Sequence, residues 1–122
     1  MDNLARAAQA LSDDTRLRIL NLLTVKECCV CEVMQALDIT QTRASRNLKI
    51  LDDAGFLQLR NDGLYSLYSL GGSASDGFHA DLLKAVKTAM RSNDEAKRDI
   101  ARLKQSKRVG PGCATVASAP CK

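Results

Sequence analysis

The 122-residue sequence contains no tryptophan, two phenylalanines, two tyrosines and one histidine. With so few aromatic side chains, the hydrophobic core must be built mainly from leucine, isoleucine, valine, alanine and methionine, which favours short helices packed on helices. No apolar run approaches the roughly 20 residues that cross a bilayer, and the first residues lack a hydrophobic signal core. We therefore predict a single cytoplasmic domain without a membrane partner.

The sequence also has little of what most enzymes use. Its one histidine, His79, is expected to lie at the surface near the start of a helix, and no glycine-rich nucleotide-binding loop is present. Acid–base catalysis needs more suitable groups than these. The pattern predicts a binding protein and not an enzyme, although turnover of a thiol substrate by the native cysteines would reverse that conclusion.

Apolar periodicity predicts four short helices in the first half of the chain. The third ends at Asp38-Ile39-Thr40, where Thr40 is placed to cap the fourth, which ends before Gly55. The four predicted helices cover residues 4–11, 14–23, 29 or 30 to 37, and 41–53.

A β-hairpin is predicted directly after the fourth helix. Residues 56–60 and 64–70 alternate in polarity, and Asn61-Asp62-Gly63 between them is a turn sequence. A helix-turn-helix followed by a hairpin is a winged helix. The predicted fold class is therefore mainly α with a small β-hairpin, a winged helix-turn-helix.

The second half of the domain is predicted to be helical again. An apolar residue recurs every four positions from Phe78 to Met90, after a cap at Ser75 or Asp76, and residues 96–103 extend this helix or form a short final one. Surplus apolar surface on the first and last helices predicts a homodimer built from them. Residues 1–104 are assigned to one domain, and residues 105–122, rich in small residues and proline, to a disordered tail.

The fourth helix has the features of a DNA-reading helix. Ala44, Leu48 and Leu51 fall on one side, while the other side is polar and basic. The start of a recognition helix enters the major groove, where Arg46 would suit a guanine and Gln41 an adenine. The predicted base-reading residues are Gln41, Thr42, Ser45 and Arg46, and the predicted phosphate-binding residues are Arg43 and Lys49.

The wing is expected to add contacts to double-stranded operator DNA. Arg60 and Asn61 lie at the predicted hairpin tip, although the neighbouring Asp62 would face phosphate. The net charge of +4 permits a polyanion partner without requiring one. The alternatives are a solvated basic helix face or a winged helix that binds another protein, and a steep loss of DNA binding with rising salt would count against the latter.

Three thiols, Cys28, Cys29 and Cys31, lie within four positions, flanked by Glu27 and Glu32. In a reducing compartment, clustered thiols are more often metal-binding or redox-reactive than structural. Cys29 and Cys31 are the main candidate ligands for a soft ion. Cys28 is either a further ligand or a small buried residue.

Cys29 and Cys31 cannot hold one ion from a regular helix, because two positions turn an ideal helix by about 200°. Ion binding therefore requires the first helical turn to unwind or to stay non-helical. We predict that a bound ion distorts this turn, shifts the helix at residues 41–53 and lowers DNA affinity. The nearby helix N-terminus is expected to lower the thiol pKa.

Four segments together are similar to one known family. They are residues 11–20, Cys29-Val30-Cys31-Glu32, Thr40-Gln41 through Ser45-Arg46-Asn47-Leu48, and Leu67-Tyr68-Ser69-Leu70. With these the chain resembles the ArsR/SmtB family of metalloregulatory repressors, and the Cys-Val-Cys run after Glu27 is most similar to the arsenic-responsive ArsR branch. The resemblance implies a homodimeric repressor that releases operator DNA on binding As(III) or Sb(III), and so controls a detoxification operon.

One position departs from the ArsR pattern. Met34 stands where that branch has a third thiol, so a third ligand would come from Cys28, from Cys113 or Cys121 in the predicted tail, from solvent, or not at all. Zinc is disfavoured because zinc-sensing relatives use several histidines. The alternatives are a Cd(II)- or Pb(II)-responsive repressor and a thiol-redox-responsive repressor of the same fold.

Overall fold

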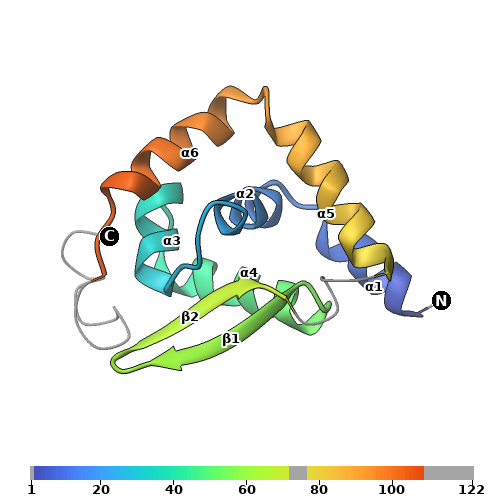
Figure 1. The fold of residues 1–122 in the computed structure, drawn as a ribbon, viewed down its shortest axis with the longest axis horizontal. Coiled ribbons are helices and arrows are strands. Elements are labelled where there is room, and N and C mark those ends of the chain that lie inside the picture. The colour runs from blue at the N-terminus through green and yellow to red at the C-terminus, as the bar shows by residue number, and fades with distance from the viewer. Residues whose placement is uncertain (1, 72–76, 109–122) are drawn as a thin grey trace.

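The computed structural model describes residues 2–71 and 77–108, so the predicted caps Ser75 and Asp76 and the thiols Cys113 and Cys121 lie outside the described residues. Its elements follow the predicted order, helices first, then a hairpin, then helices (Figure 1). They are α1 (Asp2–Ala10), α2 (Asp14–Leu23), α3 (Val30–Leu37), α4 (Gln41–Asp53), β1 (Leu57–Asp62), β2 (Tyr65–Leu70), α5 (Gly77–Met90) and α6 (Asp94–Gln105). The prediction of a mainly helical winged helix-turn-helix is confirmed.

Helix α2 lies at the centre of the fold. It contacts α3, α4, α5, α6 and strand β2, and α5 and α6 form an arch around it (Figure 1). Asp13 caps α2, because its carboxylate accepts a hydrogen bond from the backbone N–H of Arg16 at 3.1 Å. Ile19, Leu20 and Leu22 are fully buried, so α2 supplies the middle of the hydrophobic core.

The helix-turn-helix consists of α3 and α4. Asp38 ends α3 in the left-handed conformation (φ 57°), which aspartate tolerates better than most residues. Thr40 caps α4 as predicted, accepting from the backbone N–H of Arg43 at 3.2 Å. The predicted apolar side of α4 is the buried one, with Ala44, Leu48 and Leu51 all fully buried.

The hairpin forms, but its turn is shorter and later than predicted. Asp62 pairs with Tyr65, so Asn61 and Asp62 extend β1 and only Gly63 and Leu64 form the loop. Gly63 has a positive φ of 60°, as expected for glycine at the first position of a two-residue hairpin turn. The prediction of a turn at residues 61–63 is therefore wrong by about two residues.

The C-terminal helices are separate. Helix α5 ends at Met90, and Asn93 starts α6 by accepting from the backbone N–H of Ala96 at 2.9 Å. Among the described residues, no helix is long and apolar enough to cross a membrane.

His79 is buried, so the prediction of a surface histidine is wrong. Its side chain stacks on Phe78, meets Phe56 edge to face, and places Nε2 2.8 Å from the backbone oxygen of Ala54. The residue joins the start of α5 to the end of α4, which is a structural role.

Candidate nucleic-acid interface and thiol segment

The outward face of α4 offers the predicted polar side chains to solvent. Thr42, Arg46 and Lys49 are exposed, and Gln41 and Ser45 are partly exposed. Lys49 forms an exposed pair with Asp53 at 3.5 Å, which solvent screens strongly. The helix start is thus available to a groove, with Arg46 on its exposed face.

Arg43 is exposed as well, but one end of its guanidinium is bonded within the protein. Its Nη2 donates to Thr15 Oγ1 at 2.8 Å, and Arg16 Nη1 donates to Asn47 Oδ1 at 3.0 Å. These two bonds fix α4 on the start of α2. Sequence reasoning missed Arg16 and Asn47, although a polar Asn47 on the buried side of α4 was a signal that it needed a partner.

Arg60 does not lie at the hairpin tip. It sits within β1 opposite Leu67 and forms an ion pair with Glu27, which raises the pKa of Arg60 and lowers that of Glu27. Asn61 is exposed, and its Oδ1 accepts from Ser66 Oγ at 3.2 Å. The wing is therefore tied to the residue that precedes the thiols.

The backbone of Cys28 pairs with the wing. Its N–H donates to the backbone oxygen of Tyr68 at 3.0 Å, and the N–H of Tyr68 donates back to the backbone oxygen of Cys28 at 2.8 Å. The thiol is fully buried, and this burial, with the nearby Glu32 carboxylate, raises the pKa of Cys28 to about 12.

Cys29 and Cys31 lie on either side of the start of α3. Cys29 is the N-cap and is already extended (φ −87°, ψ 169°), whereas Cys31 is in the first turn. The helix begins at Val30, the later of the two predicted starts, so Cys29 lies outside it. Cys28, Cys29 and Cys31 are only 0%, 1% and 0% exposed, so an ion cannot reach the thiols in this conformation.

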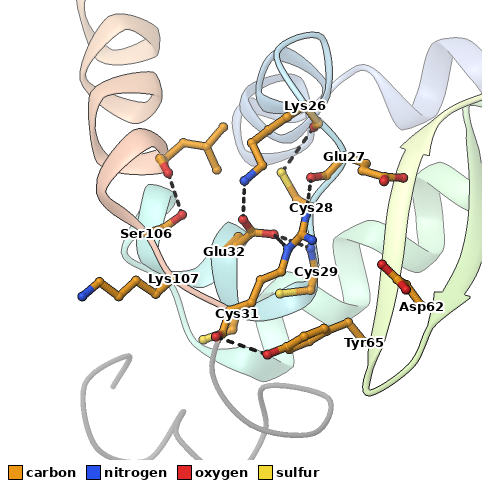
Figure 2. A network of polar contacts seen from close by, with 12 residues as sticks. Lys26, Glu27, Cys28, Cys29, Cys31, Glu32, Asp62, Tyr65, Ser106 and Lys107 are labelled. Carbon is orange, nitrogen blue, oxygen red and sulfur yellow. Dashed lines mark hydrogen bonds and ion pairs between the residues drawn. The ribbon is translucent and has the colours of Figure 1, made fainter.

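The Glu32 carboxylate organises this segment, as Figure 2 shows. It accepts from the backbone N–H of Cys29 at 2.9 Å, from Lys26 Nζ at 2.6 Å and from Arg108 Nε at 2.9 Å. Burial alone would raise the pKa of Glu32, but these three donors outweigh it and hold the pKa below its ordinary value. A buried carboxylate with three donors fixes the conformation of Cys29.

Residues 106–108, here called the strap, follow α6 and reach the thiol segment through bonds of Lys107 and Arg108; Figure 2 labels Ser106 and Lys107. The backbone N–H and oxygen of Lys107 both bond the side-chain amide of Gln35. Arg108 Nη2 donates to the backbone oxygen of Glu27 at 3.2 Å. Sequence reasoning placed these residues in a disordered tail, whereas here they make specific contacts. The domain boundary itself stays a prediction, since residues 109–122 are not described.

Cys29 and Cys31 therefore stay the candidate ligands, both near the start of α3. Within residues 2–71 and 77–108, no group of three or more His, Cys, Asp or Glu side chains could hold a metal ion. Thiolates suit soft ions. Cys28 and Cys31 also stand at the Cys-x-x-Cys spacing of dithiol redox motifs.

Comparison with known proteins gives a consistent result. Residues 13–58 match the model of "Bacterial regulatory protein, arsR family". The arsenical resistance operon repressor of Bacillus subtilis is 33% identical over 79 residues, covering 64% of this chain and 75% of that protein. That of Escherichia coli is 43% identical over 49% of this chain and 52% of its own length.

A cadmium relative matches as well. The CadC homolog of Staphylococcus aureus, a cadmium resistance transcriptional regulatory protein, is 36% identical over 69 residues, 56% of this chain and 57% of its own. This chain thus spans little more than half the length of the Staphylococcus and Escherichia proteins.

Among solved structures, a homodimeric winged helix-turn-helix DNA-binding domain from Mycobacterium bovis, a possible ArsR-family transcriptional regulator, superposes with a TM-score of 0.63. It is 30% identical, over 76% of this chain and 82% of that one. The chain therefore belongs to the arsR family of bacterial regulatory proteins, which are DNA-binding transcriptional regulators and not enzymes.

Proposed function

We propose that this regulator is a repressor that binds operator DNA as a homodimer and releases it when As(III) or Sb(III) binds Cys29 and Cys31. The observation that carries the proposal is the position of these two thiols at the start of α3, the first helix of the helix-turn-helix. Each thiol would lose its proton, which leaves with a hydroxide of the inducer as water while a sulfur–arsenic bond forms. Any movement that brings the two sulfurs together acts on the start of the helix-turn-helix.

The DNA contacts in this proposal are the base-reading Gln41, Thr42, Ser45 and Arg46 and the phosphate-binding Lys49. Arg43 would hold α4 against α2, because its guanidinium is bonded to Thr15. Arg60 would act through Glu27 and not at the wing tip. Asn61, exposed on β1, would contact the DNA backbone.

Three observations support the rest of the proposal. The Mycobacterium domain is homodimeric, and Leu4 on α1 is 43% exposed, an apolar residue that a second copy would cover. The Bacillus and Escherichia relatives are arsenical resistance repressors.

Because Cys28 is held in the wing sheet and has a raised pKa, we assign it to packing and leave the third ligand to solvent or to Cys113 or Cys121.

A cadmium- or lead-responsive repressor is the second candidate, favoured by the similarity to the Staphylococcus cadmium regulator. A thiol-redox repressor is the third, favoured by the Cys28 and Cys31 spacing. Fluorescence anisotropy on operator DNA, with reduced protein and As(III), Sb(III), Cd(II), Zn(II) or oxidant, separates all three. We expect release by As(III) or Sb(III) at low concentration; release by Cd(II) alone or by oxidant alone would contradict the arsenic assignment.

A further inference from the structure

Helix α6 is fixed firmly on α2 and α3, and this fixes where the strap begins. Asp99 is fully buried and accepts from Arg18 Nε and Nη2, both at 2.8 Å, and from Arg102 Nη2 at 2.9 Å. Arg102 Nε also donates to the backbone oxygen of Ala36 at 2.6 Å. The chain therefore leaves α6 beside the second half of α3 and runs back toward the start of that helix.

The first link between strap and thiols is Gln35. Its Nε2 donates to the Lys107 oxygen at 2.8 Å, and its Oε1 accepts from the Lys107 N–H at 3.2 Å. The same Nε2 lies 3.1 Å from Cys31 Sγ and 3.1 Å from the Cys31 oxygen. A movement of Cys31 would therefore disturb Gln35, whose side chain holds the Lys107 backbone through these two bonds.

The second link is Arg108. Its Nε and the Cys29 backbone N–H donate to the same oxygen of Glu32, each at 2.9 Å. Its own backbone oxygen accepts from Tyr65 Oη in β2 at 3.3 Å. Arg108 thus bonds both the Glu32 carboxylate, which holds Cys29, and the wing. The wing also bears Arg60, which pairs with Glu27.

These links also close the site. The thiols are at most 1% exposed, with Cys29 extended at the N-cap of α3 and Cys31 in its first turn. A movement of the Cys29 backbone toward Cys31 would strain the bond from its N–H to Glu32, and Arg108 Nε binds the same Glu32 oxygen. The contacts that hold the thiol segment are therefore also contacts that join it to the wing.

We propose that Arg108 is a positioning residue that latches the ion-free conformation, holding the thiols closed and the wing in its DNA-binding position until an ion displaces the strap. This proposal rests on the proposed function. It adds a route through the wing to the direct route from α3 to α4. The latch makes a reciprocal prediction: weakening it lowers operator affinity and raises ion affinity together, because the same equilibrium governs both.

The test uses the full-length reduced protein with Arg108→Ala and Arg108→Lys. The matched control is Lys104→Ala, which removes an exposed positive charge from the same end of α6. The first readout needs no ion: the rate at which iodoacetamide alkylates Cys29 and Cys31, located by mass spectrometry. We expect a rise of about tenfold for Arg108→Ala, the factor typical of losing one charge-assisted hydrogen bond, a smaller rise for Arg108→Lys, and no change for the control.

The second readout is anisotropy on operator DNA. Arg108→Ala should bind ion-free operator several-fold more weakly and release it at a lower As(III) concentration than wild type. Alkylation rates equal to those of the control, or an operator affinity and As(III) midpoint that both stay unchanged, would overturn the latch. If Arg108→Ala fails to fold by circular dichroism, Arg108→Lys decides by the same criteria.

Failure of the proposed function would look different. If As(III) does not release wild-type operator, the arsenic assignment fails, while the alkylation rates and the ion-free operator affinity still decide the latch. Faster alkylation with weaker ion-free binding would support it, and unchanged values would overturn it.

Discussion

The outer face of α4 and the thiol segment are neighbours in the chain but are built in opposite ways. The face around Arg46 is exposed and its helix is capped locally by Thr40. The thiols are buried and held by Arg108 and Tyr68, tens of residues away in sequence. Under the proposed function, this difference makes α4 a preformed DNA reader and the thiol segment a sensor that must open before it can act.

The largest expected effect is the difference in stability between a substitution on the buried side of α4 and one on its exposed side. Leu51→Ala removes a fully buried side chain and should lower the free energy of unfolding by about 2–5 kcal/mol. Arg46→Ala, on the exposed side, should change it by less than about 0.5 kcal/mol. Urea denaturation at one fixed protein concentration measures both, and equal losses would show that the α4 faces are misassigned.

The next effect is on DNA reading. Arg46→Ala should weaken operator binding by about 1–3 kcal/mol, because a bidentate contact to a base is lost. Alkylation of Cys29 and Cys31 should stay at the wild-type rate, since Arg46 lies outside the sensor. Lys97→Ala, an exposed charge on α6, is the matched control in anisotropy. An equal loss for Lys97→Ala would indicate only a general charge effect.

The smallest effect is within the thiol segment. Cys28→Ala should cost about 1 kcal/mol of stability, as one buried sulfur is lost, and should leave the As(III) midpoint of operator release unchanged. The comparison is with Cys29→Ser and Cys31→Ser, which should abolish the response. A large rise in the midpoint for Cys28→Ala would instead make Cys28 a ligand.

What the sequence could predict follows the same division. Thr40, Gly55 and the spacing of Ala44, Leu48 and Leu51 act over one or two helical turns, and they gave α4 correctly at both ends. The hairpin was also predicted from local alternation. Its turn was misplaced because Asn61-Asp62-Gly63 suits a turn in isolation, whereas strand pairing continued to Asp62 and Tyr65.

The thiol segment could not be predicted as fully, because its contacts are long-range. Nothing local to Arg108 shows that it bonds Glu32, 76 residues earlier, and its small-residue neighbours favoured a tail. The residues around Arg60 are typical of a wing tip, but Arg60 forms an ion pair with Glu27, 33 residues earlier in the chain. His79 was expected at the surface, whereas packing on Phe56 and Phe78 and a bond to the Ala54 backbone hold it inside.

The most direct test of the central claim, that ion binding at the start of α3 controls DNA release, is one anisotropy titration. Wild type and the Cys29→Ser/Cys31→Ser double variant are bound to operator in reductant, and As(III) is added. We predict that wild type loses about 5- to 150-fold in operator affinity, the usual range for allosteric coupling, while the double variant stays bound. Equal release from both proteins would contradict the claim.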